Sequence, residues 1–351
     1  MTRIAIDAMG GDNAPRAIVE GAVWAAMEYN IPIELVGKLY DIERELDRIE
    51  QDGIVISFGG ILPPKRIKVN LKNLDIKKTQ AAEVIEMGEA PGQAIRKKKN
   101  SSIVLAVNAV VTGSSDAVVA AGSTGAAMGA SLFGMGRLPG IERPAIATVL
   151  PTMKGPLVLI DSGANTDCTA SMLYQFGLMG STYAKNVLGI KNPRIALLNI
   201  GEEAGKGDEL AKDTYKLFDE NKDQLNFIGN AEGKEIFLGN ADVIVCDGFV
   251  GNVTLKTIEG VARMFFFMVK NEFYKDIISK IIGLIVRPIF KNLYKKINYE
   301  EFGGALLLGV KGITVICHGR STAYAIKNAV KVAYNAVESG VNNAISSYYG
   351  E

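Results

Sequence analysis

Apolar, β-branched runs recur along the chain, and each ends in a loop rich in Gly, Asp and Asn that opens into a helical pattern. This alternation predicts an α/β fold with a mostly parallel sheet and helices on its faces. Ligands of such sheets bind beyond the carboxyl ends of the strands, so we expect the loops of these units to share one cleft. The four clearest units are RIAIDAMGGDNAPRAIVEGAVWAA, SDAVVAAGSTGAAMGASLFG, RIALLNIGEEAGKGDELAKDTY and DVIVCDGFVGNVTLKTIEGVARM, which begin at Arg3, Ser115, Arg194 and Asp242.

The stretch RPAIATVLPTMKGPLVLIDSGAN, from Arg143 to Asn165, departs from this alternation. Its two apolar runs flank a Pro-Thr-Met-Lys-Gly turn, which predicts a hairpin and therefore some antiparallel pairing within the sheet. A purely repeating βα fold is thus disfavoured.

Residues 252–297 are rich in large apolar residues and carry Lys280, Arg287, Lys291 and Lys295 at steps of seven, four and four. These steps place the cations on one face of a helix, which we expect Pro288 to interrupt. Two compatible interpretations are open. The segment is a helix and partner buried in a dimer interface, or a basic, apolar-tipped hairpin that contacts a membrane surface or an acidic carrier protein.

The chain has 351 residues, of which 48% are hydrophobic and 38 are glycine. This length suits one elaborate domain or two intertwined lobes, and no low-complexity linker divides it. The formal charge of +1 gives no overall attraction to nucleic acid. Any anion site therefore has to be local.

Three cysteines without CxxC spacing and a single histidine do not complete the usual zinc-binding sets, so we expect a reducing compartment and no structural metal. Asp7 stands where a signal peptide needs its apolar centre, and no stretch approaches ~18 uninterrupted apolar residues. The expectation is a cytoplasmic protein that does not span a membrane.

The glycine-rich loops do not fit the nucleotide-binding motifs. GEEAGKGD has three residues between its first two glycines where a P-loop has four, and AGSTGAAMG lacks the GxGxxG spacing. The loops do suit anion binding, because glycine allows close backbone approach and the following helix presents free N–H groups. Their side-chain donors are Ser123, Thr124, Asn199, Lys206, Asn252 and Lys256.

His318 follows Cys317 on an expected strand, so the two side chains should point to opposite faces and cannot form a thiol–base pair. Cys246 ends an apolar strand and is expected in the core, and no GxSxG elbow marks a serine hydrolase. His318 is then either an ordinary strand-end residue or, with the guanidinium of Arg320, a donor to phosphate or an oxyanion.

Seven blocks of the chain resemble the successive signatures of the bacterial phosphate acyltransferase family PlsX. They extend from Ile4 to the C-terminal helix and are IAIDAMGGDNAP, MGEAPGQAIRKKKNSS, AAGSTGA, IDSGANTD, NIGEEAGKG, VCDGFVGNVTLKTIEG and EFGGALLLGVKGITVICHGRS. Two blocks carry a small polar swap relative to the family form, and Ser123 stands where that form has asparagine. The backbone role of its loop is unaffected.

The resemblance implies transfer of a long-chain acyl group from acyl-acyl carrier protein to inorganic phosphate. The acyl phosphate then serves phospholipid synthesis together with the glycerol-phosphate acyltransferase PlsY. It further implies a homodimer without a cofactor, cytoplasmic or peripherally attached to the membrane. The implied fold is a three-layer α/β/α domain with a mixed, mostly parallel sheet, like that of isocitrate/isopropylmalate dehydrogenases and phosphotransacetylases. We expect it to span 1–351 as two intertwined lobes, with 252–297 as a protruding helical hairpin.

Such a reaction needs little covalent help from the protein. Phosphate is a competent nucleophile, and a thiolate with a pKa of about 8.5 leaves readily. The remaining needs are a phosphate pocket, a donor to the developing oxyanion, and positioning, which lowers a barrier by ~7 kcal/mol or more.

The expected catalytic residues are His318, Arg320, Asn199, Asn252 and Lys206. The expected phosphate or oxyanion contacts are Gly122, Ser123, Thr124, Gly125, Asp161, Asn165 and Lys256. The expected contacts to carrier protein or membrane are Arg287, Lys291, Lys295 and Lys296. Two other functions remain open: a phosphotransacetylase that uses acyl-CoA, and a non-catalytic membrane scaffold in which the glycine loops are only structural.

Overall fold

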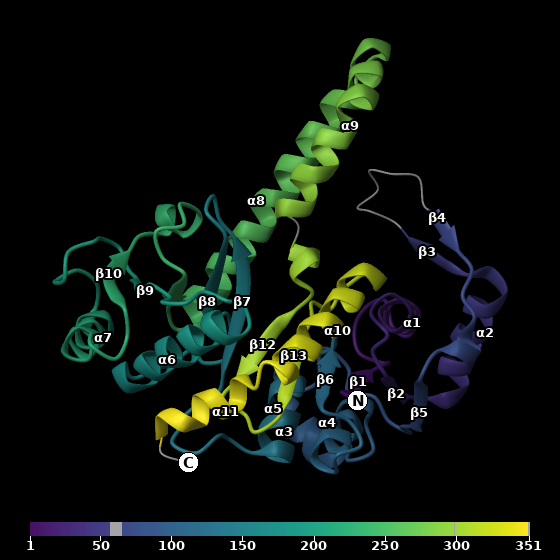
Figure 1. The fold of residues 1–351 in the computed structure, drawn as a ribbon, viewed down its shortest axis with the longest axis horizontal. Helices are drawn as coiled ribbons and strands as arrows, with labels where there is room; N and C mark the ends of the chain where they lie inside the picture. The colour runs from purple at the N-terminus through teal and green to yellow at the C-terminus, as the bar shows by residue number, and fades with distance from the viewer. Residues whose placement is uncertain (57–64, 298, 350–351) are drawn as a thin grey trace.

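The computed structural model describes residues 1–56, 65–297 and 299–349, without the side chains of 56, 65, 287, 291–292, 294–297 and 299. Among these residues, eleven strands form one sheet in the order β10-β9-β11-β8-β7-β12-β13-β6-β1-β2-β5 (Figure 1). A separate antiparallel pair, β3 and β4, lies beside α2.

The N-terminal elements are β1 (Ile4–Asp7), α1 (Arg16–Tyr29), β2 (Ile33–Gly37), α2 (Leu39–Asp52), β3 (Ile54–Ile56), β4 (Lys65–Ile67), η1 (Leu71–Asn73), β5 (Ile76–Gln80), α3 (Pro91–Lys97), α4 (Ser102–Val111), β6 (Ala117–Ala120) and α5 (Thr124–Met135). The middle of the chain forms β7 (Ala145–Pro151), β8 (Pro156–Ile160), α6 (Ala170–Asn186), β9 (Ile195–Leu198), α7 (Glu209–Glu220), β10 (Phe227–Ala231), η2 (Gly233–Phe237) and β11 (Val243–Val245). The C-terminal elements are α8 (Gly248–Tyr274), α9 (Ile277–Ile297), η3 (Tyr299–Phe302), β12 (Ala305–Leu308), β13 (Ile313–Ile316), α10 (Ala323–Glu338), α11 (Val341–Ser346) and η4 (Ser347–Tyr349).

The predicted hairpin is confirmed: β7 and β8 pair antiparallel around the turn at Thr152–Gly155. Gly155 adopts a φ of 144°, which glycine reaches without steric cost. The Thr152 N–H then donates to the Gly155 carbonyl at 2.9 Å and closes the turn.

Strand direction reverses in the middle of the sheet. Strands β5, β2, β1, β6 and β13 are mutually parallel, and so are β8, β11, β9 and β10. Three antiparallel pairings connect the two groups, β13 with β12, β12 with β7, and β7 with β8. Because this number is odd, the carboxyl ends of the two groups lie at opposite edges. The four glycine-rich loops, which we expect to share one cleft, therefore follow strands that end at opposite edges of the sheet.

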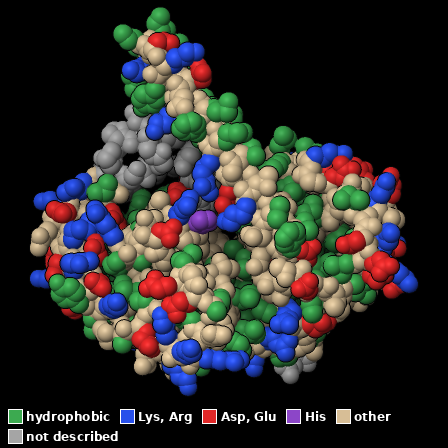
Figure 2. All heavy atoms as spheres, turned by 180° about the vertical axis from the view of Figure 1, so that it is seen from behind, with side chains coloured by type: hydrophobic (Ala, Val, Ile, Leu, Met, Phe, Trp, Pro, Cys, Tyr) green, Lys and Arg blue, Asp and Glu red, His purple; other side chains and the backbone are tan. Residues whose placement is uncertain are grey.

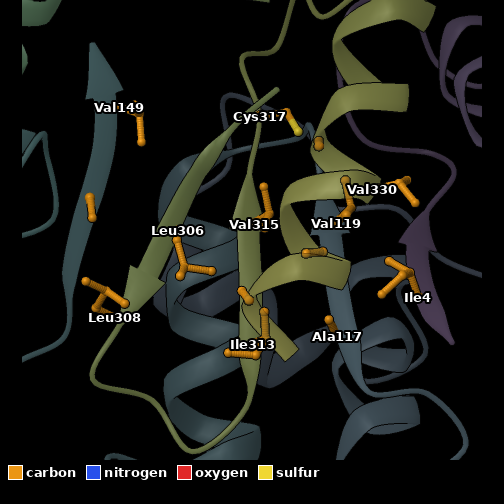
Figure 3. Close-up of a cluster of buried hydrophobic side chains, with 14 of the residues drawn as sticks. Ile4, Ala117, Val119, Val149, Leu306, Leu308, Ile313, Val315, Cys317 and Val330 are labelled. Atoms are coloured by element: carbon orange, nitrogen blue, oxygen red, sulfur yellow. The ribbon is translucent and has the colours of Figure 1, made fainter. Parts of the chain in front are cut away.

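One face of the sheet carries a continuous core, and the other carries two separate clusters. Alternate strand residues such as Ile4, Val119, Leu306 and Val149 (Figure 3) point to the continuous face, where α1, α2, α6, α7, α10 and α11 pack on them. On the opposite face, one cluster lies under α3, α4 and α5, and another lies under α8. Helices α5 and α8 thus cover different parts of the same face.

Helices α8 and α9 form a hairpin that protrudes far from the sheet (Figure 1). The break between them is at Lys275 and Asp276, and the Asp276 carboxylate caps α9 by accepting the Ser279 N–H at 2.8 Å. Pro288 lies inside α9. The expected interruption at Pro288 is therefore wrong, because the capped turn at Asp276 ends the helical pattern earlier and the chain passes Pro288 as helix.

Candidate active site

His318 lies just beyond the carboxyl end of β13. Its strand neighbour Cys317 is buried in the continuous core, and His318 points to the opposite face, as the alternation along a strand requires. The backbone N–H of Arg320 donates to His318 Nδ1 at 3.1 Å. The neutral ring therefore carries its proton on Nε2.

A polar stripe on α8 meets this histidine. Asn252, Lys256, Glu259 and Arg263 follow one another at steps of four, three and four, which places them on one helical face. The Glu259 carboxylate lies 3.1 Å from Lys256 Nζ, 3.6 Å from the Arg263 guanidinium and 3.8 Å from His318 Nε2. Figure 2 shows the chain's single histidine among Lys and Arg side chains at the foot of the hairpin, above a hollow in this face.

Partial burial lowers the pKa of His318 below its ordinary value of 6.5. The positive charges of Lys256, Arg263 and Arg320 lower this pKa further, whereas the Glu259 carboxylate opposes them. Arg320 in turn lies 3.8 Å from the exposed Asp12 carboxylate. The group therefore combines a neutral histidine with three cations and two carboxylates, a balance that favours an anion.

The loops after β1 and β6 pack closely beside His318. A β-carbon on Gly10 would meet the backbone of Gly122 at 2.8 Å, and one on Gly11 would meet the Gly319 carbonyl at 2.9 Å. The Asp12 N–H donates to that same carbonyl at 2.7 Å. These approaches bring the β1, β6 and β13 loops together.

The predicted residues Gly122, Ser123, Thr124 and Gly125 stand at the start of α5. The Ser123 hydroxyl accepts the Ala126 N–H at 3.4 Å and caps the helix, and Thr124 is its first residue. Gly125 leaves room for Pro91, which a β-carbon would approach to 2.7 Å. Of the N–H groups in the first helical turn, that of Ala126 is thus engaged by the cap, and the others belong to the kind of helix start that binds anions.

Asp161 organises the loop after β8. Its buried carboxylate accepts N–H groups from Ile146, Gly163, Ala164 and Asn165, and also the Asn165 side-chain amide. Burial raises the pKa of Asp161, and these hydrogen bonds oppose the increase. Asn252 lies 3.6 Å from the β-carbon position of Gly163. Asp161, Asn165 and Asn252 are therefore brought together, with the Asp161 oxygens engaged by the loop itself.

Asn199 and Lys206 lie in the loop after β9, at the other edge of the sheet. The Asn199 amide donates to the Lys206 carbonyl at 3.1 Å and its oxygen accepts the Ile200 N–H at 2.8 Å. These contacts close the loop on itself. The structure thus groups Asn199 and Lys206 with each other and not with the β1, β6 and β13 loops, because β9 and β13 run in opposite directions.

An apolar groove of about 850 Å³ runs along α8. Leu150, Ile236 and Cys246 belong to the core cluster under α8, and they line the groove together with Val250, Ile258 and Phe265 of the helix. Glu259 and Phe302 also line it. Since Glu259 contacts His318, the groove and the cationic group are neighbours.

The cysteines have environments that disfavour thiolates. Burial raises the pKa of Cys317 to about 12 and that of Cys246 well above its ordinary value. Within the parts of the chain that the structure describes, no cluster of His, Cys, Asp and Glu is arranged to hold a metal ion.

Two acids near strand ends, Asp247 and Asp7, have structural roles. Asp247 accepts the N–H groups of Phe249 and Val250 and caps α8. Asp7 is buried. Burial raises the pKa of its carboxyl group, and a hydrogen bond from Ser102 opposes this increase. The side chains of Arg287, Lys291, Lys295 and Lys296, expected to contact carrier protein or membrane, lie outside the described residues.

Sequence reasoning missed Glu259 and Arg263. The steps of four and three from Asn252 through Lys256 to Glu259 already predict one polar face on a helix whose other faces are apolar.

No described helix is both long and apolar enough to cross a membrane.

The comparisons with known proteins agree with this structure. A family described as fatty acid synthesis protein matches residues 65–344. A phosphate acyltransferase from Halothermothrix orenii is 46% identical over 340 residues, covering 97% of this chain and 96% of that protein. Another from Pelotomaculum thermopropionicum is 49% identical over 345 residues, covering 98% and 94%.

Solved structures confirm the three-layer, phosphotransacetylase-like fold. A phosphotransacetylase from Streptococcus pyogenes superposes with a TM-score of 0.60 at 16% identity, covering 96% of this chain and 94% of the other. The EutD phosphotransacetylase from Staphylococcus aureus gives 0.57 at 12% identity, covering 96% and 94%. The near-full-length identity to the two relatives and the family match lead to one conclusion: this chain belongs to the phosphate acyltransferase family of enzymes.

Proposed function

We propose that the chain transfers an acyl group from acyl-acyl carrier protein to inorganic phosphate. The observation that carries this proposal is the contact between a cationic group and an apolar groove, which meet at Glu259. An anion site beside an apolar groove suits a reaction between phosphate and a thioester with a hydrocarbon chain. The similarity to phosphate acyltransferases supports the same acceptor.

In this proposal, phosphate binds between Lys256, Arg263 and Arg320. A phosphate oxygen attacks the thioester carbonyl carbon, and a C–O bond forms as the carbonyl oxygen becomes an oxyanion. The oxyanion then collapses, the C–S bond breaks, and the carrier thiolate leaves and takes up a proton. Acyl phosphate and free carrier protein are the products.

His318 is assigned the oxyanion in this scheme. Its Nδ1 already accepts a backbone N–H, so the neutral ring offers Nε2–H as a donor and has no site left to take a proton from phosphate. A preset donor of this kind acts on charge that develops in the transition state. Asn252 and the α5 N-terminus at Thr124 supply further donors, and Asn165 acts by holding its loop.

We further propose that the chain forms a homodimer, binds acyl carrier protein and works together with PlsY. The α8–α9 hairpin is the proposed contact surface for these partners. Large apolar side chains are exposed along both hairpin helices, among them Phe267, Ile278, Ile281 and Ile285. Exposed apolar rows of this size mark an interaction surface.

The test is to incubate the protein with palmitoyl-acyl carrier protein and phosphate and trap acyl phosphate with hydroxylamine. Phosphate-dependent hydroxamate from the carrier-protein substrate, reduced at least a hundredfold in His318→Ala, is the expected result. Faster reaction with palmitoyl-CoA would point to a phosphotransacetylase. No product from either thioester, with the protein folded, would favour the scaffold function.

A further inference from the structure

Glu259 carries a buried carboxylate on α8, a helix whose other side chains are mostly exposed or partly exposed. Its side chain is 7% exposed, compared with 48% for Lys256 and 56% for Arg263. Burying a carboxylate raises the free energy of the folded state unless the charge is paired. The groups around Glu259 should therefore include cations that compensate its charge.

The partners come from both sides of the site. Lys256 lies one turn before Glu259 and Arg263 one turn after it, and both cations reach back to the same carboxylate. His318 approaches the carboxylate from the β13 loop. Glu259 is thus the anchor around which the two cations and the histidine are arranged.

The anchored cations keep donors for a ligand. Lys256 has three N–H donors and directs its Nζ at a single carboxylate, while the Arg263 guanidinium, at 3.6 Å, is held by charge rather than by a direct hydrogen bond. Both side chains are about half exposed, so they remain accessible from solvent.

We propose that Glu259 is the positioning residue of the phosphate site. Its carboxylate holds Lys256 and Arg263 side by side and facing His318, so that phosphate meets a preset pair of cations. This inference rests on the proposed function. Glu259 does not touch phosphate in this arrangement and acts through its neighbours.

The first test compares Glu259→Gln with Glu220→Gln, a matched change on α7 where the carboxylate is exposed and 3.9 Å from Lys216. Glu259→Gln should raise the KM for phosphate tenfold or more and change the KM for the acyl donor less than twofold. Glu220→Gln, which lies outside the hairpin and the site, should change neither KM. Equal increases in both KM values would indicate general damage and overturn the proposal, and so would a fall in the phosphate KM, which would mean that Glu259 merely repels the anion.

The second test does not depend on turnover. His318 is the only histidine, so the signal of its Hε1 ring proton in the NMR spectrum reports its titration without residue assignment. The charged groups that face it are Lys256, Glu259 and Arg263 of α8 and Arg320 of its own loop, beyond which lies Asp12. Inorganic phosphate should shift this signal in the wild type and at least tenfold more weakly, per unit concentration, in Glu259→Gln. The same response in both proteins would overturn the proposal.

A double variant separates positioning from a direct role. If Glu259 acts through Lys256 and Arg263, then Glu259→Gln combined with Lys256→Gln should raise the phosphate KM by clearly less than the product of the two single effects, because the share of the Glu259 effect that runs through Lys256 is already lost. Independent, multiplying effects would contradict this. A wild type that shows the phosphate-dependent NMR shift but forms no acyl phosphate would refute the proposed function and leave the positioning role of Glu259 standing.

Discussion

His318 keeps its neutral form because its surroundings disfavour a second proton. Nδ1 is engaged by the Arg320 N–H, and burial together with nearby cations lowers the ring pKa. In the unfolded chain the ring returns to an ordinary pKa near 6.5. Below that pH the unfolded chain binds a proton that the folded chain does not, so this residue makes the fold less stable as pH falls.

We therefore predict that His318→Gln loses less stability than the wild type when the pH is lowered from 7.5 to 5.5. Urea unfolding at both pH values measures the free energy of unfolding of each protein. The other titrating groups are the same in both proteins, so the difference between the two losses reports His318. Identical losses would show that His318 titrates normally in the folded state.

Lys256 is expected to contribute a direct charge to phosphate binding. Lys256→Gln should raise the KM for phosphate roughly tenfold or more, since a hydrogen bond to a charged group is worth about 1.5–3 kcal/mol. Lys270→Gln, on the exposed surface of the same helix, is the control. Steady-state kinetics at several salt concentrations should show the difference narrowing as salt rises. A salt-independent difference would argue against a charge effect.

Helix α8 depends on two glycines at its start. A β-carbon on Gly251 would overlap the Asp161 carbonyl, and one on Gly248 would lie 2.7 Å from the backbone of Asn165. Because these are backbone atoms, no side-chain movement can relieve the contact. The close approach sets the position of the whole polar stripe.

Gly251→Ala should therefore destabilise the protein by about 1–3 kcal/mol, as overpacking does. Gly260→Ala is a control on the same helix, where a β-carbon meets nothing within 4 Å. That change should stabilise the protein by about 0.5–1 kcal/mol, because alanine is the better helix former. Denaturant unfolding of both variants decides, and a neutral Gly251→Ala would mean that α8 moves away without cost.

Local elements could be predicted from the sequence, whereas their arrangement could not. The turn around Lys154 predicts the β7–β8 hairpin because its conformational signal is contained in five residues. The reversal of the sheet depends on β12, which pairs with β7 across more than 150 residues, and no local pattern reports that partnership. For the site, the loop residues Ser123 and Arg320 were identified by type, but Glu259 required the helical face to be recognised first.

At the scale of the molecule, the hairpin cations offer a test that rests on the sequence. Replacing Arg287, Lys291, Lys295 and Lys296 by Glu should weaken binding to carrier protein or to anionic liposomes, by about 1 kcal/mol for each charge lost near a membrane surface. Co-sedimentation and binding titrations at low salt measure this. Retention of both affinities would remove these cations from the partner surface.

The reversed sheet also dictates the order in which the site can form during synthesis. One group of strands through β6 and another from β7 to β11 are complete before residue 300, but only β12 and β13 connect them. His318 itself follows β13. When the ribosome has made 300 residues, the nascent chain therefore contains two half-sheets that are not yet joined. Glu259 is then already present in α8, but His318 has not been synthesised. The anion site is assembled only when the last two strands insert between the halves, so a chain interrupted there has most of its mass and none of its proposed chemistry.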